Sequence, residues 1–106
     1  MNRKPICRVA DMPVNGVIEF ETAEGTTVCL INAGDRIFAC QAACPHQGSP
    51  LCDGAFDGDV LTCLHHLWQW SLREGGAPRG LAGATLPMYS VEVEGDCVYV
   101  AAHGDR

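Results

Sequence analysis

Short segments in which apolar and polar residues alternate run along most of the chain, and this alternation predicts β-strands. The segments cover residues 17–21, 27–31, 36–40, 60–63, 67–72, 90–94 and 97–101. The last two flank Gly95-Asp96 and form the clearest hairpin. No long amphipathic helix stands out, although a helical turn is compatible with residues 9–12. Many short strands joined by Gly- and Pro-containing turns predict an all-β fold, a small antiparallel β-sandwich or barrel.

The middle third of the chain, about residues 40–80, interrupts this rhythm. Turn-forming residues are frequent there, and functional side chains are commonly carried by loops on a rigid frame. Residues 75–80 are too rich in Gly and Pro to be a strand, so this loop either covers a site or simply connects two strands.

Two short segments of this region each offer one cysteine and one histidine. The first is Cys44-Pro45-His46, and the second, sixteen residues later, is Cys63-Leu64-His65-His66. Two thiolates and two imidazoles from matched loops suit a mixed-ligand [2Fe–2S] centre of the Rieske type, in which histidine replaces cysteine on one iron. A single tetrahedral zinc is the alternative for this donor set. The two-residue gap selects His66 as the ligand and leaves His65 as its neighbour.

The donor set itself predicts the chemistry. Two thiolates place a charge of −2 on the inner iron, whereas neutral imidazoles leave the outer iron easier to reduce. The pattern therefore describes a one-electron carrier and not an enzyme. No nucleophile–base constellation and no phosphate-binding glycine loop accompanies it.

Composition fits one cytoplasmic domain. The 106 residues are 47% apolar and 19% charged, which is typical of a packed globular protein. No run of about 18 apolar residues is present, and the basic start is not followed by the apolar stretch of a secretory signal. The net charge is −6 and no Lys/Arg stripe is present, which argues against nucleic acid binding. The negative charge suits electrostatic steering toward basic faces of redox partners, although a solvated surface explains it equally well. We expect a monomer with no membrane partner.

The other cysteines show no framework spacing. They are Cys7, Cys29, Cys40, Cys52 and Cys97. In a reducing cytoplasm we expect them to be small buried apolar side chains, and Cys29, Cys40 and Cys97 lie inside strand patterns. Cys52 falls in the turn-rich stretch, and Cys40 with Cys44 is an alternative thiolate pair.

Over almost its entire length the chain resembles a Rieske-type ferredoxin, most closely the ferredoxin component of toluene-type monooxygenases. The stretches that carry this resemblance are 44–47, 60–63, 66–68 and 89–96. The resemblance implies one domain over residues 1–106, with a cluster-binding segment at about 40–80. It also implies that Cys44 and Cys63 bind the inner iron and that His46 and His66 bind the outer one.

The resemblance further implies the partners. These are an NADH-dependent flavin- and iron–sulfur-containing reductase and a terminal oxygenase, here a diiron hydroxylase that acts on aromatic hydrocarbons or alkenes. Ferredoxins of aromatic-ring dioxygenases share the ligand motif, and only the flanks, chiefly Gln47 and Leu67-Trp68, favour the monooxygenase. The motif also fits the Rieske small subunit of a nitrite reductase, and the four donors alone also fit a zinc-stabilised binding module.

Departures from the respiratory Rieske proteins predict a low potential. Those proteins clamp the two loops with a disulfide, whereas the matching positions here hold Ser49 and His65. They also carry hydroxyl side chains that donate hydrogen bonds to the cluster sulfurs. The corresponding positions here fall near Trp68 and Trp70, which have no hydroxyl. We therefore expect a potential near the bottom of the roughly −150 to +300 mV Rieske span. Trp68 itself either packs under the loop or contacts a partner.

Overall fold

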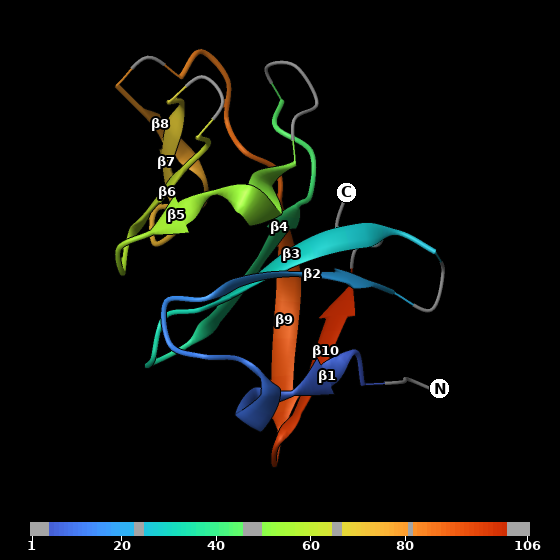
Figure 1. The fold of residues 1–106 in the computed structure, drawn as a ribbon. Helices are drawn as coiled ribbons and strands as arrows, with labels where there is room; N and C mark the ends of the chain where they lie inside the picture. The colour runs from blue at the N-terminus through green and yellow to red at the C-terminus, as the bar shows by residue number, and fades with distance from the viewer. Residues whose placement is uncertain (1–4, 23–24, 46–49, 65–66, 81, 102–106) are drawn as a thin grey trace.

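Two antiparallel sheets make up most of the part of the chain that the computed structural model describes, residues 5–22, 25–45, 50–64, 67–80 and 82–101 (Figure 1). The strands are β1 (Cys7–Arg8), β2 (Val17–Glu21), β3 (Thr27–Asn32), β4 (Ile37–Gln41), β5 (Ala55–Phe56), β6 (Val60–Thr62), β7 (Gln69–Ser71), β8 (Ala77–Arg79), β9 (Met88–Glu94) and β10 (Cys97–Ala101). Two 3-10 turns, η1 (Val9–Asp11) and η2 (Leu51–Asp53), complete the regular structure of these residues. The predicted all-β class with antiparallel sheets is confirmed.

The larger sheet has the order β1-β10-β9-β4-β3-β2 and forms the base of the molecule. Strand β3, between β4 and the edge strand β2, is buried on both faces, and its alternate residues point to opposite sides of the sheet. Val28 and Leu30 join a core to which all six strands of this sheet contribute, so the sheet curls around it. Cys29 and Ile31 join a second core that is shared with the smaller sheet.

The smaller sheet, of order β5-β6-β7-β8, lies at one end of the molecule (Figure 1). Strand β4 leads the chain out of the base and β9 returns it, so the smaller sheet is an insertion between two neighbouring strands of the larger one. Its strands run from residue 55 to residue 79, within the segment where the sequence places the unusual chemistry.

Several sequence expectations need correction. Ala77–Arg79 is a strand, although the Gly and Pro content of residues 75–80 argues against one. Pro78 is tolerated because β8 is an edge strand, where the missing N–H interrupts no second ladder. Gly76 precedes it at φ +84°, and a Cβ there would collide with the Leu86 carbonyl. Residues 77–79 of the loop 75–80 are therefore the outer strand of the smaller sheet and not an irregular connection.

The remaining differences concern short elements. The strand expected at 67–72 is limited to β7, while β1 and β5, of two residues each, carry no alternation to detect. The helical turn expected near residue 9 is η1. Within the described residues, no helix has the length and apolarity needed to cross a membrane.

Candidate metal centre

The first ligand segment is a loop that starts where β4 ends. The Leu51 amide donates to the Ala42 carbonyl at 2.8 Å, and Ala43 pairs with Pro50 across the base of the loop. The Gln41 side chain donates to the Ala43 carbonyl at 2.7 Å and stiffens the same turn. Cys44 follows directly and is 2% exposed. His46 and Ser49 lie outside the described residues.

The second ligand segment starts where β6 ends, and it is closed in the same way. The Cys63 amide donates to the Trp68 carbonyl at 2.8 Å, and the Leu67 amide donates to the Cys63 carbonyl at 2.7 Å. Leu67 has φ +62°, a left-handed conformation that a leucine adopts only at a cost of roughly 1–2 kcal/mol. Such local strain is typical of functional loops. Cys63 is fully buried, whereas His65 and His66 lie outside the described residues.

The two cysteines therefore occupy equivalent places, each at the start of a loop whose base is fixed by backbone hydrogen bonds. Both belong to the same buried cluster between the two sheets. Figure 1 shows that the segments leading into both loops run toward the same end of the molecule. Two sulfur donors offered by separate, anchored loops fit the thiolate half of a Rieske ligand set.

Cys40 is a poor substitute for either of them. It lies within β4 opposite Cys29, not in a loop, and burial raises the pKa of its thiol to about 12. Its backbone is fixed by pairing with β3 on one side and β9 on the other, unlike that of a loop cysteine. The alternative Cys40–Cys44 pair is therefore disfavoured by the structure.

The two tryptophans that follow the second loop are structural. Trp70 is fully buried in β7, and its indole N–H donates to the Ala84 carbonyl at 2.8 Å. Trp68 stacks edge-on against Trp70, with ring centroids 6.1 Å apart, and a Cβ on Gly83 would lie 3.6 Å from its ring. The packing interpretation of Trp68 is thus supported. The N–H of Trp70 is already used, which agrees with the expected shortage of donors to the cluster sulfurs.

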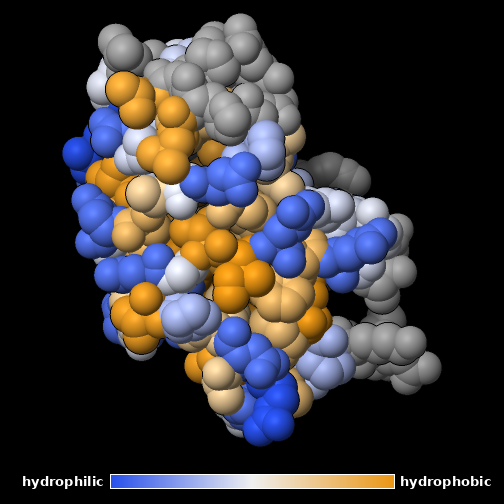
Figure 2. All heavy atoms as spheres, viewed as in Figure 1, coloured by the Kyte–Doolittle hydropathy of each residue, from blue (hydrophilic) through white to orange (hydrophobic). Residues whose placement is uncertain are grey.

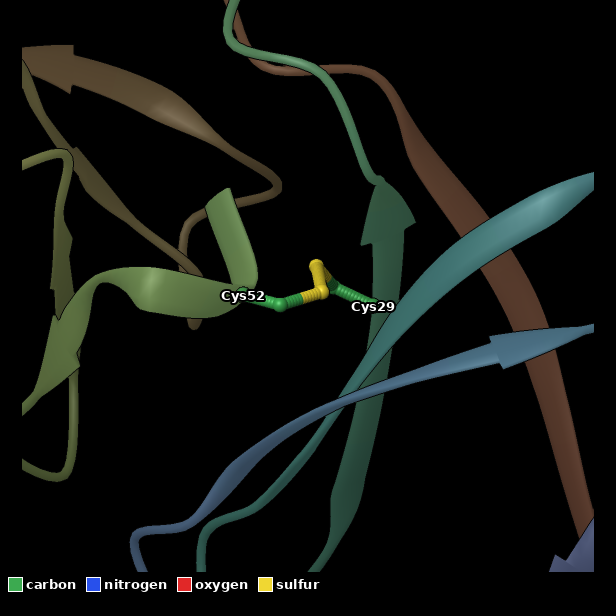
Figure 3. Close-up of a disulfide and its surroundings, with 2 residues drawn as sticks. All are labelled: Cys29 and Cys52. Carbon is green, nitrogen blue, oxygen red and sulfur yellow. A yellow bond between two sulfur atoms is a disulfide. The ribbon is translucent and has the colours of Figure 1, made fainter. Parts of the chain in front are cut away.

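A disulfide between Cys29 and Cys52 corrects the expectation of isolated buried thiols (Figure 3). Cys29 is buried as expected, and Cys52 in η2 reaches it from the smaller sheet's side of the shared core. Cys40 is buried, whereas Cys7 in the edge strand β1 and Cys97 in the neighbouring strand β10 are only half-buried. Burial next to Asp11 and Asp96 raises the pKa of Cys7 to about 11.

A family model for the Rieske [2Fe-2S] domain matches residues 2–90. The chain belongs to the Rieske [2Fe-2S] domain family. Like other members of this family, it carries one [2Fe–2S] cluster, and the buried Cys44 and Cys63 are compatible with that cofactor.

The Rieske chain also resembles individual ferredoxins over nearly its full length. It is 26% identical over 96 residues to ferredoxin CarAc of Metapseudomonas resinovorans, covering 91% of this chain and 90% of that one. It is 29% identical over 101 residues to the 3-phenylpropionate/cinnamic acid dioxygenase ferredoxin subunit of Escherichia coli (strain K12), with 94% and 93% covered.

A solved structure gives the same result. A chain in the complex of reduced oxygenase and oxidized ferredoxin in carbazole 1,9a-dioxygenase superimposes with a TM-score of 0.82 at 25% identity, covering 93% of this chain and 92% of that one. The Rieske ferredoxin assignment is thus confirmed. The narrower expectation of a diiron monooxygenase component finds no support in these relatives, which favour the dioxygenase alternative.

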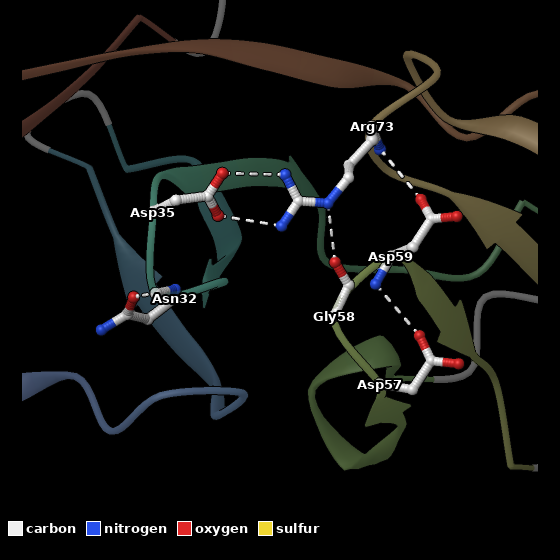
Figure 4. A network of polar contacts seen from close by, with 7 residues as sticks. Asn32, Asp35, Asp57, Gly58, Asp59 and Arg73 are labelled. Atoms are coloured by element: carbon white, nitrogen blue, oxygen red, sulfur yellow. Dashed lines mark hydrogen bonds and ion pairs between the residues drawn. The ribbon is translucent and has the colours of Figure 1, made fainter.

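A polar contact that the sequence does not reveal joins the two sheets of this Rieske domain (Figure 4). Arg73, just after β7, binds both carboxylate oxygens of Asp35 in the β3–β4 turn, at 2.9 and 3.1 Å. Its Nε donates to the Gly58 carbonyl at 2.8 Å. The hydrogen bond from Arg73 holds the pKa of Asp35 below its usual value. This bidentate pair is the geometry in which an exposed ion pair is most specific.

Asp59, in the turn between β5 and β6, stabilises the same region through further hydrogen bonds. It accepts a hydrogen bond of 2.6 Å from the Ser71 hydroxyl, so the β5–β6 turn is tied to β7. The carboxylate of Asp57 accepts the amide protons of Val60 and Asp59, which lowers its pKa. Sequence periodicity contains no signal for the Ser71–Asp59 contact, because it joins a strand to a turn twelve residues earlier.

Proposed function

We propose that this protein is a mobile one-electron carrier that receives electrons from an NADH-dependent flavin- and iron–sulfur-containing reductase and delivers them to the terminal oxygenase of an aromatic ring-hydroxylating dioxygenase. The observation that carries the proposal is the near-complete mutual coverage with a dioxygenase ferredoxin subunit and with a chain of a carbazole 1,9a-dioxygenase complex.

Four side chains are proposed to hold the cluster, Cys44 and Cys63 on the inner iron and His46 and His66 on the outer iron. The bound cluster supplies reversible storage of one electron. The chain contributes the anchored loops, which keep the donors in place in both redox states. It also contributes the buried core beneath them, which excludes water from the sulfur side.

The docking face is proposed to surround the second loop. Leu64 and Leu67, on either side of the histidine pair, are 56% and 60% exposed. On the face shown in Figure 2, apolar atoms lie at the end of the molecule that carries the smaller sheet. A small apolar surface beside an electron-transfer group suits transient encounters, which are typically small in area. The net charge of −6 suits a basic partner face around it.

We expect that replacing both leucines by asparagine slows electron delivery about tenfold at limiting carrier concentration, because two exposed apolar side chains no longer become buried on docking. Asparagine is well tolerated at the left-handed backbone of Leu67. The measurement is stopped-flow oxidation of the reduced protein by its oxygenase. Val14, 64% exposed in the turn before β2, is the matched control, and Val14→Asn leaves the rate unchanged. Equal slowing by both changes would contradict the proposed face.

The choice of oxygenase has a direct test. The reduced protein is mixed with the terminal oxygenase encoded beside it, and that oxygenase is assayed for a mononuclear-iron Rieske centre or a diiron centre. Electron transfer to a Rieske oxygenase supports the proposal. Transfer only to a diiron hydroxylase would instead establish the second candidate, which the flanking residues Gln47 and Leu67-Trp68 favour.

A further inference from the structure

The Cys29–Cys52 disulfide joins the two parts of the molecule at their junction (Figure 3). Cys29 lies in β3, the strand between β2 and β4 in the larger sheet, and Cys52 lies in η2. Their Cα atoms are 5.9 Å apart, within the usual span of a disulfide. The bond closes a stretch of chain with a sequence separation of 23 that contains all of β4 and the first ligand loop.

The position of η2 connects this bond to both ligand loops. Leu51, the first residue of η2, closes the first loop through its hydrogen bond to Ala42. Gly54, which ends η2, is so close to the Thr62 carbonyl that a Cβ would collide with it. Thr62 directly precedes Cys63. Anchoring η2 to β3 therefore fixes the closing end of the first loop and the entry to the second.

We propose that Cys29 and Cys52 form a redox modification site, and that their oxidation to the disulfide slows release of the cluster by holding both ligand loops on the larger sheet. In a reducing compartment disulfides form transiently and often report redox state. In this proposal the bond forms and breaks with the redox state of the surroundings and is not a fixed structural bridge. This inference requires only that the chain holds a cluster, and it is independent of which oxygenase receives the electrons.

The oxidant is a low-molecular-weight disulfide such as glutathione disulfide. Cys52 is the half-exposed partner and reacts first. Its thiolate attacks one sulfur of the oxidant, the oxidant's S–S bond breaks, and one thiol is released. The Cys29 thiolate then attacks the Cys52 sulfur and displaces the second thiol. Two protein thiols are oxidised, one small disulfide is reduced to two thiols, and the two protons leave with them.

A third cysteine lies beside the pair and is a possible competing partner in this reaction. Cys40 is the cross-strand neighbour of Cys29, and residues in such positions have Cβ atoms only about 4.5–5.5 Å apart. Cys29 is nevertheless the cysteine placed to reach Cys52, because their Cα atoms lie within the span of a disulfide, whereas Cys40 lies on the neighbouring strand β4. Oxidation should therefore yield the Cys29–Cys52 bond and not a bond to Cys40.

The experiment uses the cluster-loaded protein in glutathione buffers of graded disulfide-to-thiol ratio. Peptide mapping after alkylation identifies the bonded pair, and the decay of visible absorption with an iron chelator gives the half-time of cluster release. We expect the Cys29–Cys52 bond to appear as the buffer becomes more oxidising. The half-time of cluster release should then be at least fivefold longer than in the reduced protein. Closing a loop of this size raises the folding equilibrium constant by roughly two orders of magnitude.

Two variants complete the test. Cys52→Ser should release its cluster at the rate of the reduced protein in every buffer, whereas Cys97→Ser, which removes a half-buried thiol elsewhere, should respond like the unaltered protein. The comparison of oxidised and reduced unaltered protein stands even where a variant folds poorly. Unmodified Cys29 and Cys52 in the most oxidising buffer, a bond to Cys40, or a release rate that ignores the disulfide would each overturn the inference.

Discussion

Replacing Cys44 or Cys63 with alanine is expected to abolish the visible absorption of the protein and to reduce its bound iron from two atoms per chain to a small remaining fraction. Each cysteine starts a loop whose base is fixed by backbone hydrogen bonds, so no neighbouring donor can move into its place. Loss of one of four ligands leaves an iron under-coordinated and open to water. Iron and acid-labile sulfide analysis of the purified variants measures the effect.

Cys40→Ala is the matched control for this experiment. Cys40 is the same residue type and is buried in the same core, but it belongs to β4 and not to a loop. The variant should therefore keep its cluster, with at most a modest loss of stability from the small cavity. Loss of iron in Cys40→Ala with retention in Cys44→Ala would reverse the ligand assignment.

Trp70→Ala is expected to lower the apparent Tm of the cluster-loaded protein by roughly 15 °C. The indole is fully buried at the centre of the smaller sheet, between β6 and β8, and truncation of such a side chain costs about 3–5 kcal/mol. The lost hydrogen bond adds little, because Ala84 is exposed and its carbonyl can bind water instead. Most of the fall in Tm therefore comes from the lost packing of the ring.

The apparent Tm is measured at one heating rate, because cluster release makes unfolding irreversible. Trp68→Ala is the control in the same sheet region, where the ring is only half-buried, and its Tm should fall by clearly less. A Trp70→Ala variant within about 3 °C of the unaltered protein would contradict the role assigned to this side chain.

The base of the fold was predictable because its strands are long enough to show a period. Residues 17–21, 27–31 and 97–101 are strands within one residue of the expected bounds. The smaller sheet was harder to predict, because β5 is too short to alternate and β8 contains a proline that only an edge position tolerates.

The sequence could propose Cys44 and Cys63 as ligands because their spacing to histidine is a local signal, and the structure places both of them, buried, at the start of a loop. The Cys29–Cys52 bond and the Arg73–Asp35 pair were not predictable, since each joins elements that meet only after folding. The motif also could not identify the oxygenase that receives the electrons, because monooxygenase and dioxygenase ferredoxins share the same four donors. Similarity along the whole chain, and not the motif, favours the dioxygenase.

Two histidine nitrogens, from His46 and His66, are proposed to bind the cluster together with two cysteine sulfurs, and the electron-carrier function depends on this ligand set. Pulsed EPR of the dithionite-reduced protein tests it most directly, with natural-abundance protein compared with protein labelled with ¹⁵N only in histidine. We predict strong couplings to two nitrogens that change with the label, one of which disappears in His46→Ala or His66→Ala if the altered site keeps any cluster. A reduced cluster without histidine-dependent nitrogen couplings, or a colourless protein that contains zinc, would contradict this ligand set.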